Sequence, residues 1–239
     1  MNILIIKIGA LGDVVRTSFI AQALKEKYRE KNLRIFWITG KGATQLFVNN
    51  PYVDEIITNE NKNHITKIVF DLVINLEEDK ENCLFASSLK TKKLIGAFLN
   101  KAGEIDYSEE GAYWFDMSMI SKYGKKEADK LKKRNKKTHR QILSEMLGID
   151  YKKYEPFLRL TSAQRAIVKN FARRYNLSRS DLVIGINSGA ADRWPKALPI
   201  KKTSKLIDEL YKKYNAKILL FGGPNETERN KEIQKYTNS

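Results

Sequence analysis

The chain has 239 residues with 42% hydrophobic content, which is ordinary for a folded protein and excludes disorder along its whole length. A single cysteine, Cys83, excludes an internal disulfide, and two histidines far apart in sequence disfavour a His/Cys zinc site. The net charge of +16 predicts attraction to polyanions such as nucleic acid, an anionic membrane or a phosphorylated substrate, although lysines on solvated faces give the same charge without such a role.

The first hundred residues alternate strand-like and helix-like segments. Residues 2–8 form a continuous aliphatic run, which is typical of a strand buried on both faces and is too short for an export signal. Apolar residues at i, i+4 spacing predict a helix over residues 15–28. We expect further strands at 33–39, 55–58, 71–76 and 93–96, and a helical stretch at 43–48. Strands that alternate with helices predict βαβ units and a parallel sheet.

The middle of the chain is less regular and very basic. Residues 100–125 are rich in aromatic side chains and have no clear periodicity. Between residues 122 and 140, ten Lys or Arg stand against two acidic residues. This segment is either a solvated, lysine-covered helix or a surface that contacts an anionic inner leaflet or a phosphorylated lipid-linked acceptor. An apolar helical face then resumes, and Gly148 is expected to end that helix.

A second α/β unit follows. We expect a helix from Ser162, a strand at 181–187, a helix at about 199–213 and a strand at 217–221. The predicted domains are residues 1–158 and 159–239. Two strands and two helices do not complete a doubly wound domain, so the second domain is expected to be truncated in this sequence.

The turn K-I-G-A-L-G-D-V-V-R-T joins the first strand to the first helix. Ligands of open α/β sheets bind beyond the carboxyl ends of the strands, so the N–H groups of this turn are expected to be available to an anion. The turn is not G-x-G-x-x-G, and no acidic residue ends the second strand, which disfavours an NAD site. Asp13 would repel a phosphate. It either accepts a proton from a hydroxyl or caps the first helix.

Two later loops also follow predicted strands: I-N-S-G-A-A-D-R-W-P and F-G-G-P-N-E-T-E-R. Asn187, Ser188 and the N–H of Gly189 are candidates for hydrogen bonds to a diphosphate, and Arg193 would supply positive charge. Glu226 is a candidate acceptor for a ribose or base donor. Each feature also has a purely structural interpretation, because glycines are common in such turns and Glu226 favours the start of a helix.

The three loops, in this order, resemble glycosyltransferase family 9, the lipopolysaccharide heptosyltransferases. The resemblance covers both ends of the chain and implies a GT-B architecture, in which two Rossmann-like domains bind the acceptor sugar and a nucleotide-sugar donor such as ADP-heptose. It implies inverting, metal-independent transfer of a sugar, heptose in the best-known members, to a lipopolysaccharide-core or other cell-surface glycan. The implied partners are the nucleotide-sugar donor and an anionic lipid-linked acceptor, with no cofactor and no specific nucleic acid. The protein is expected to be cytoplasmic, with peripheral contact to the inner face of the cytoplasmic membrane.

Carried over residue by residue, the resemblance makes Asp13 the general base, with Gly12 and Arg16 beside the acceptor or a phosphate. It makes five positions face the donor: Asn187, Ser188, Gly189, Arg193 and Glu226. Two departures stand out. Family members commonly carry Lys-Arg-Trp-Pro or Lys-His-Trp-Pro, whereas this sequence has Asp-Arg-Trp-Pro at 192–195, so the lysine is absent and Arg193 is its nearest substitute. The family's later D-x-G-x-x-H segment does not occur before Ser239.

Two other functions remain open from the sequence. A basic nucleic-acid-binding protein without catalysis is suggested by the pI of about 9.7, although no RRM, helix-turn-helix or zinc-finger pattern occurs and the glycine loops would go unexplained. The other is an NAD-dependent oxidoreductase, which the spacing of the first glycine turn disfavours.

Overall fold

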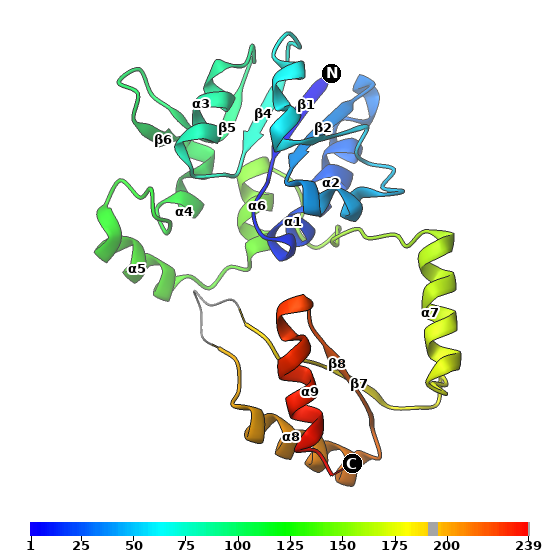
Figure 1. Cartoon of the computed structure of the whole chain (residues 1–239). Helices are drawn as coiled ribbons and strands as arrows, with labels where there is room; N and C mark the ends of the chain where they lie inside the picture. Colours follow the sequence, from blue (N-terminus) through cyan, green and yellow to red (C-terminus); the bar gives the residue numbers. More distant parts are fainter. Residues whose placement is uncertain (191–195, 239) are drawn as a thin grey trace. The chain divides into compact units, whose positions relative to one another are not determined.

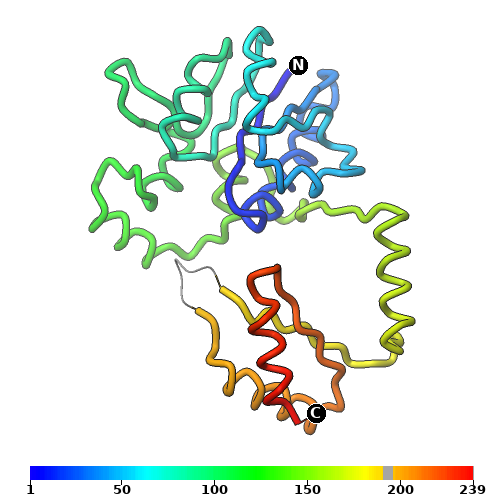
Figure 2. The backbone as a smooth tube through the Cα atoms, viewed as in Figure 1, coloured from blue at the N-terminus to red at the C-terminus, as the bar shows by residue number. Residues whose placement is uncertain are grey.

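The computed structural model describes residues 1–190 and 196–238, and it divides into two compact units, Met1–Thr161 (unit 1) and Ser162–Ser239 (unit 2). Figure 1 shows the elements of each unit, and Figure 2 follows the path of the backbone through them.

Unit 1 is built on a six-stranded sheet with the order β3-β2-β1-β4-β5-β6. Its strands are β1 (Asn2–Ile6), β2 (Arg34–Thr39), β3 (Glu55–Thr58), β4 (Leu72–Asn75), β5 (Leu94–Leu99) and β6 (Ile105–Tyr107). All neighbouring strands are parallel except β6, which runs antiparallel to β5. The predicted parallel sheet is therefore confirmed. The strand order reverses between β1 and β4, which is where sheets of this kind bind ligands.

The helices of unit 1 are α1 (Leu11–Thr17), α2 (Phe19–Lys27), α3 (Lys80–Ser88), α4 (Ala112–Phe115), α5 (Gly124–Arg134) and α6 (His139–Leu147). The helix predicted for residues 15–28 is in fact two helices, separated at Ser18, whose hydroxyl donates to the carbonyl of Val15 at 2.8 Å. Such a bond from a serine to its own backbone competes with helix continuation. The stretch predicted as helical at 43–48 is a 3-10 helix, Lys41–Phe47.

The core of unit 1 lies on both faces of the sheet, as the continuous aliphatic run of β1 predicts. Ile3 and Ile5 belong to one buried cluster with residues of α1, α2 and α6, whereas Leu4 and Ile6 belong to a second cluster with residues of α3. Each such side chain contributes about 1.5–3 kcal/mol when it is fully removed from water. β1 is therefore a central strand of the sheet that is covered on both faces.

The basic segment of unit 1 forms α5, and α6 follows it. The Thr138 side chain accepts from the Gln141 N–H at 3.2 Å and the Gln141 side chain accepts from the Thr138 N–H at 2.8 Å, so a capping box starts α6. Gly148 ends the helix in the left-handed conformation (φ 59°), as predicted. This cap fixes His139 at the first turn of α6.

Unit 2 contains α7 (Ser162–Arg174), β7 (Val183–Asn187), α8 (Ile200–Tyr214), β8 (Lys217–Phe221) and α9 (Thr227–Lys235). β7 and β8 are parallel neighbours, with Val183 opposite Lys217. In the described part of unit 2, both strands are edge strands, because no third strand pairs with either. α7 buries none of its side chains, and several apolar residues of the unit are exposed: Ile167, Val168, Phe171, Leu182 and Phe221.

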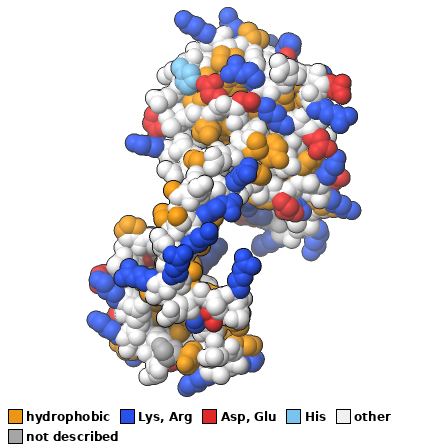
Figure 3. All heavy atoms as spheres, turned by 90° about the vertical axis from the view of Figure 1, so that its right-hand side faces the viewer, with side chains coloured by type: hydrophobic (Ala, Val, Ile, Leu, Met, Phe, Trp, Pro, Cys, Tyr) orange, Lys and Arg blue, Asp and Glu red, His pale blue; other side chains and the backbone are white. Residues whose placement is uncertain are grey.

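The surface carries basic side chains in both units. On the face in Figure 3, many Lys and Arg side chains are spread out with acidic side chains among them, and a row of basic side chains crosses the middle of the view. Among the described residues, no helix has both the length and the apolar character needed to cross a bilayer.

Candidate functional site

The first glycine turn lies at the carboxyl end of β1, and a carboxylate of the protein itself is bound to it. Glu77, two residues after β4, accepts three hydrogen bonds on Oε1: from the N–H of Ile8 at 2.7 Å, the N–H of Gly9 at 3.0 Å and Nζ of Lys7 at 2.8 Å. The expectation that the N–H groups of this turn are available to a ligand anion is therefore wrong for Ile8 and Gly9. Glu77 already provides them with a negative charge.

Asp13 is the third residue of α1 and does not cap it. The N-cap residue is Ala10, and no side chain bonds to the cap. The helix-cap interpretation of Asp13 is therefore wrong. Its carboxylate is 41% exposed and pairs with Nη2 of Arg16 at 2.9 Å. A methyl group added at Gly12 would meet no atom within 4 Å, so the surface next to Asp13 is open. The structure thus brings together the three residues predicted for this part of the site.

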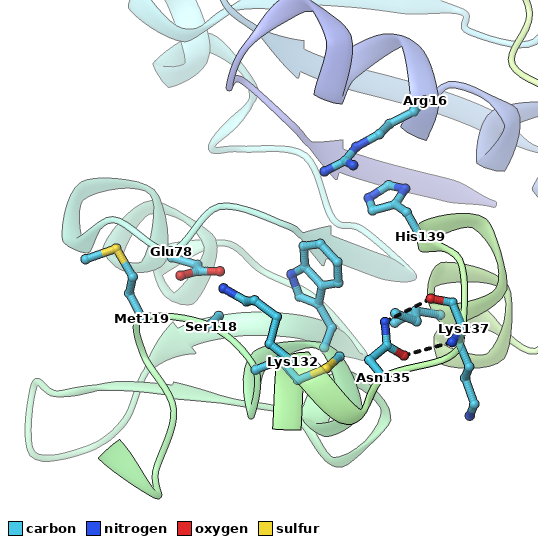
Figure 4. A pocket seen from close by; sticks show the side chains of 11 residues that line it. Arg16, Glu78, Ser118, Met119, Lys132, Asn135, Lys137 and His139 are labelled. Carbon is cyan, nitrogen blue, oxygen red and sulfur yellow. Dashed lines mark hydrogen bonds between the residues drawn. The ribbon is translucent and has the colours of Figure 1, made fainter. Parts of the chain in front are cut away.

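Unit 1 has a pocket of about 370 Å³, and Arg16 is one of the residues that line it. Figure 4 shows Arg16, from α1, next to His139, from the start of α6, with Glu78 farther along the pocket. The indole of Trp114 packs edge-on against the His139 ring, with 5.1 Å between ring centroids. The polar and aromatic side chains that line the pocket include Arg16, Glu78, Trp114, Ser118, Lys132 and His139.

The pocket contains two titratable groups with shifted pKa values. Burial lowers the pKa of His139 to about 4, and the nearby positive charge of Arg16 adds to this effect. The ring is therefore neutral at pH 7. Its Nδ1 atom is buried and has no hydrogen-bond partner among the described residues. Burial also raises the pKa of Glu78, although the Ser118 hydroxyl and the Met119 N–H oppose the shift.

Three consecutive acidic residues after β4 have three different tasks. Glu77 binds the glycine turn, Glu78 lines the pocket, and Asp79 caps α3 by accepting from the N–H of Asn82 at 2.9 Å. None of the three was predicted from the sequence as a site residue, and neither was His139. The position of the three acidic residues, just after a predicted buried strand, could have marked them as site candidates, because ligands of open α/β sheets bind at the carboxyl ends of the strands. No motif indicates His139.

A second pocket, of about 810 Å³, lies in unit 2 at the carboxyl ends of β7 and β8. Its lining includes Asn187, Gly189, Gly222, Gly223, Glu226 and Arg229. Three of the predicted donor-binding residues therefore line one pocket: Asn187, Gly189 and Glu226. Arg229, the last residue of the third loop, was not predicted. Arg193 lies outside the described residues.

Glu226 explains two of the glycines in these loops. Its Oε2 atom accepts from the N–H of Gly223 at 2.7 Å. A Cβ atom at Gly189 would lie 2.4 Å from Glu226 Cγ, and one at Gly222 would lie 2.4 Å from Glu226 Cβ. Real Cβ contacts are never that short, so these positions are glycine because the Glu226 side chain approaches their backbone closely.

The predicted donors of the second loop bond within unit 2. The buried hydroxyl of Ser188 donates to Asn230, and the N–H of Gly189 donates to Oδ1 of Asn187 at 3.1 Å. Nε of Arg229 donates to the Ser188 carbonyl at 2.9 Å. In this structure, Ser188 and Gly189 therefore shape the loop, and their contacts with a diphosphate remain a prediction.

No cluster of three or more His, Cys, Asp or Glu side chains that would suit a metal ion occurs among the described residues.

Comparison with known proteins gives a consistent answer about the fold. No protein-family model matches the sequence, and no curated protein matches it. A glycosyl transferase of family 9 from Veillonella parvula superposes with a TM-score of 0.71 at 18% identity, covering 100% of this chain and 67% of its own. The chain has the fold of a family 9 glycosyltransferase. The resemblance and the GT-B architecture predicted from the three loops are confirmed at this level.

Two further structures agree with the first. The E. coli ADP-heptose lipopolysaccharide heptosyltransferase II matches with a TM-score of 0.60 at 16% identity, covering 100% of this chain and 70% of its own. An E. coli heptosyltransferase bound to ADP matches with a TM-score of 0.58 at 15% identity, covering 100% of this chain and 72% of its own. At these identities, the similarity concerns the fold alone.

Proposed function

We propose that the chain is a glycosyltransferase that moves a sugar, heptose in the first instance, from an ADP-linked donor to a lipopolysaccharide-core or other anionic lipid-linked glycan. One observation carries the proposal. In a fold shared with family 9 glycosyltransferases, each unit has a pocket at or beside the carboxyl ends of its parallel strands, and Arg16, the ion-pair partner of Asp13, lines one of them.

The proposed reaction is a single displacement. Asp13 takes the proton of the acceptor hydroxyl as the hydroxyl oxygen forms its bond to the anomeric carbon. The bond from that carbon to the diphosphate breaks on the opposite face, and the electron pair leaves with the nucleoside diphosphate. Arg16 holds the Asp13 carboxylate in one orientation. The exposure of this carboxylate and the open surface at Gly12 support the role.

The pocket of unit 2 is the proposed donor site. The guanidinium of Arg229 provides positive charge, since its two bonds to carbonyl groups of Ser188 and Leu198 do not neutralise it. Glu226 is the proposed acceptor for a ribose hydroxyl, and Arg193 is proposed to assist the leaving diphosphate by analogy with the family lysine. Two neighbours carry ADP or ADP-linked sugar in their names, which supports the choice of nucleotide.

The pocket of unit 1 is the proposed acceptor site. Three cations line it, Arg16, Lys132 and Lys137, of which Arg16 is paired with Asp13 and Lys137 with Glu145. Trp114 adds an aromatic surface of the kind that packs on sugar rings. A volume of about 370 Å³ is near the lower limit for small-molecule sites and suits one or two sugar rings. Lys132 is the lining cation proposed to meet a negatively charged group of the acceptor.

The test is Asp13→Asn, which keeps the size of the side chain and removes its basicity. We expect turnover with ADP-heptose to fall roughly 10²–10⁴-fold while the affinity for ADP, measured by calorimetry, is kept. Asp71→Asn, at the opposite end of the same sheet, is the control and should leave both unchanged. Near-normal turnover of Asp13→Asn would remove Asp13 from the base role, and absence of ADP binding to the unaltered chain would refute the donor site.

A further inference from the structure

The turn between β1 and α1 is held by one oxygen atom of Glu77. Three donors converge on Oε1, namely two successive backbone N–H groups and the Lys7 ammonium, at 2.7–3.0 Å. The Lys7 and Glu77 side chains are only 13% and 15% exposed, so this contact lies below the surface. Successive N–H groups that point at one spot, joined by a cation, form an anion-binding site, and here the anion belongs to the protein.

Glu77 is itself fixed to the sheet. Asn75, the fully buried last residue of β4, accepts from the Glu77 N–H at 3.1 Å, and its amide donates to the Glu77 carbonyl at 3.2 Å and to the Ala97 carbonyl at 2.8 Å. β1 and β4 are parallel neighbours with Ile6 opposite Asn75. The turn after β1 is therefore bound to the end of β4, and through it to β5.

The same turn determines where Asp13 lies. Ala10 follows Gly9, and its carbonyl accepts from the N–H of Asp13 at 2.8 Å and of Val14 at 3.2 Å, which starts α1. Only three residues thus lie between Gly9, whose N–H is bound by Glu77, and Asp13, the proposed base. A shift of Gly9 moves the first turn of α1, and Asp13 moves with it.

We propose that Glu77 is the positioning residue of this turn, a built-in anion in the place where other glycine turns bind a ligand phosphate. It keeps the turn in shape without a ligand, so that Asp13 is presented before any substrate binds. The role of Asp13 rests on the proposed function, but the anion site does not.

The proposal makes a specific prediction about Glu77→Ala. Removal of the carboxylate leaves the Lys7, Ile8 and Gly9 donors around an empty anion site, which a small carboxylate such as formate can fill. The matched control is Asp71→Ala. Asp71 lies at the other end of β4, accepts from the Asn2 N–H at 2.8 Å and pairs with Lys92 at 2.6 Å, so the control removes the same charge from the same strand pair.

The experiment measures amide hydrogen exchange of residues 7–14 in sodium formate and in sodium chloride at equal ionic strength. In Glu77→Ala, we expect exchange of this segment to be about tenfold or more faster than in the unaltered chain, and to slow again in formate. In Asp71→Ala, the segment should exchange as in the unaltered chain, with no effect of formate. Turnover of Glu77→Ala should fall by about 10²-fold with the KM for the donor kept, and formate should restore part of it.

Three results would overturn the proposal. Formate without effect on the segment in Glu77→Ala would show that no anion site is formed there. Equal acceleration in Asp71→Ala would show that both carboxylates only stabilise the sheet. Unchanged exchange in Glu77→Ala would show that the turn does not need the charge. If Glu77→Ala does not fold, Glu77→Gln replaces it. Its segment 7–14 is expected to exchange faster than in the unaltered chain, by less than the tenfold expected for Glu77→Ala. If the unaltered chain has no transferase activity, the proposed function is contradicted. The exchange measurement does not depend on activity, so it still decides whether the anion site exists.

Discussion

His139 should make unit 1 less stable in acid than at neutral pH. Burial and Arg16 lower the pKa of its ring from 6.5 to about 4 in the folded protein. The difference, 6.5 − 4, is about 2.5 pKa units, which corresponds to about 3 kcal/mol at about 1.36 kcal/mol per unit. Below pH 6.5 the unfolded chain binds a proton that the folded chain refuses. His139 therefore leaves the free energy of unfolding unchanged above about pH 6.5 and lowers it progressively as the pH falls from 6.5 toward 4.

NMR can measure this directly, because the chain has only two histidines. His64 is exposed and has a carboxylate partner, Glu55, at 3.1 Å, which raises its pKa above 6.5. Two imidazole titrations are therefore expected on opposite sides of 6.5, and His64→Gln assigns them. Urea denaturation of the unaltered chain and of His139→Gln, compared between pH 4 and 7, isolates the histidine from the carboxylates that also titrate. A His139 titration at or above 6.5, or equal pH dependence of the two proteins, would refute the reasoning.

Two further predictions concern the glycine loops and the basic helix. Gly189→Ala should destabilise unit 2 by about 1–3 kcal/mol in urea denaturation and weaken ADP binding, because its Cβ would displace the Glu226 side chain. Gly12→Ala, which meets no atom, should leave stability unchanged or raise it by up to about 1 kcal/mol, and equal effects of the two changes would contradict this account. The chain should sediment with vesicles of acidic lipid at low salt and be released at high salt, through the lysines of α5, whereas equal binding to neutral vesicles would exclude electrostatic attraction.

The sequence predicted the fold well wherever local pattern and packing agree. The aliphatic run of β1 was recognised as a doubly covered strand because its buried residues do not alternate with polar ones. Gly148 was recognised as a helix end because few other residues adopt its positive φ. The break at Ser18 was missed, since a side chain that bonds to its own backbone leaves the apolar spacing of α1 and α2 intact.

The candidate site residues that the sequence predicted all lie in the three glycine loops. Gly12, Asp13 and Arg16 lie close together in α1, and Asn187, Gly189 and Glu226 lie at or just after the ends of the neighbouring strands β7 and β8. Glu77 could not be assigned, because its partners are about 70 residues away and meet it only once β4 is known to lie beside β1. The low pKa of His139 likewise depends on burial by segments without a regular pattern.

The division of tasks among Glu77, Glu78 and Asp79 makes the length of this segment more critical than its composition. Each carboxylate acts according to its distance in residues from Asn75, since consecutive side chains leave the chain in different directions. Deletion of one of the two glutamates would place the remaining glutamate at the glycine turn and Asp79 in the pocket. Lys80 would then stand at the N-cap position of α3. Two adjacent identical residues, which look interchangeable in the printed sequence, are therefore distinguished by register, and a one-residue deletion should be tolerated far less well than exchange of either glutamate for glutamine.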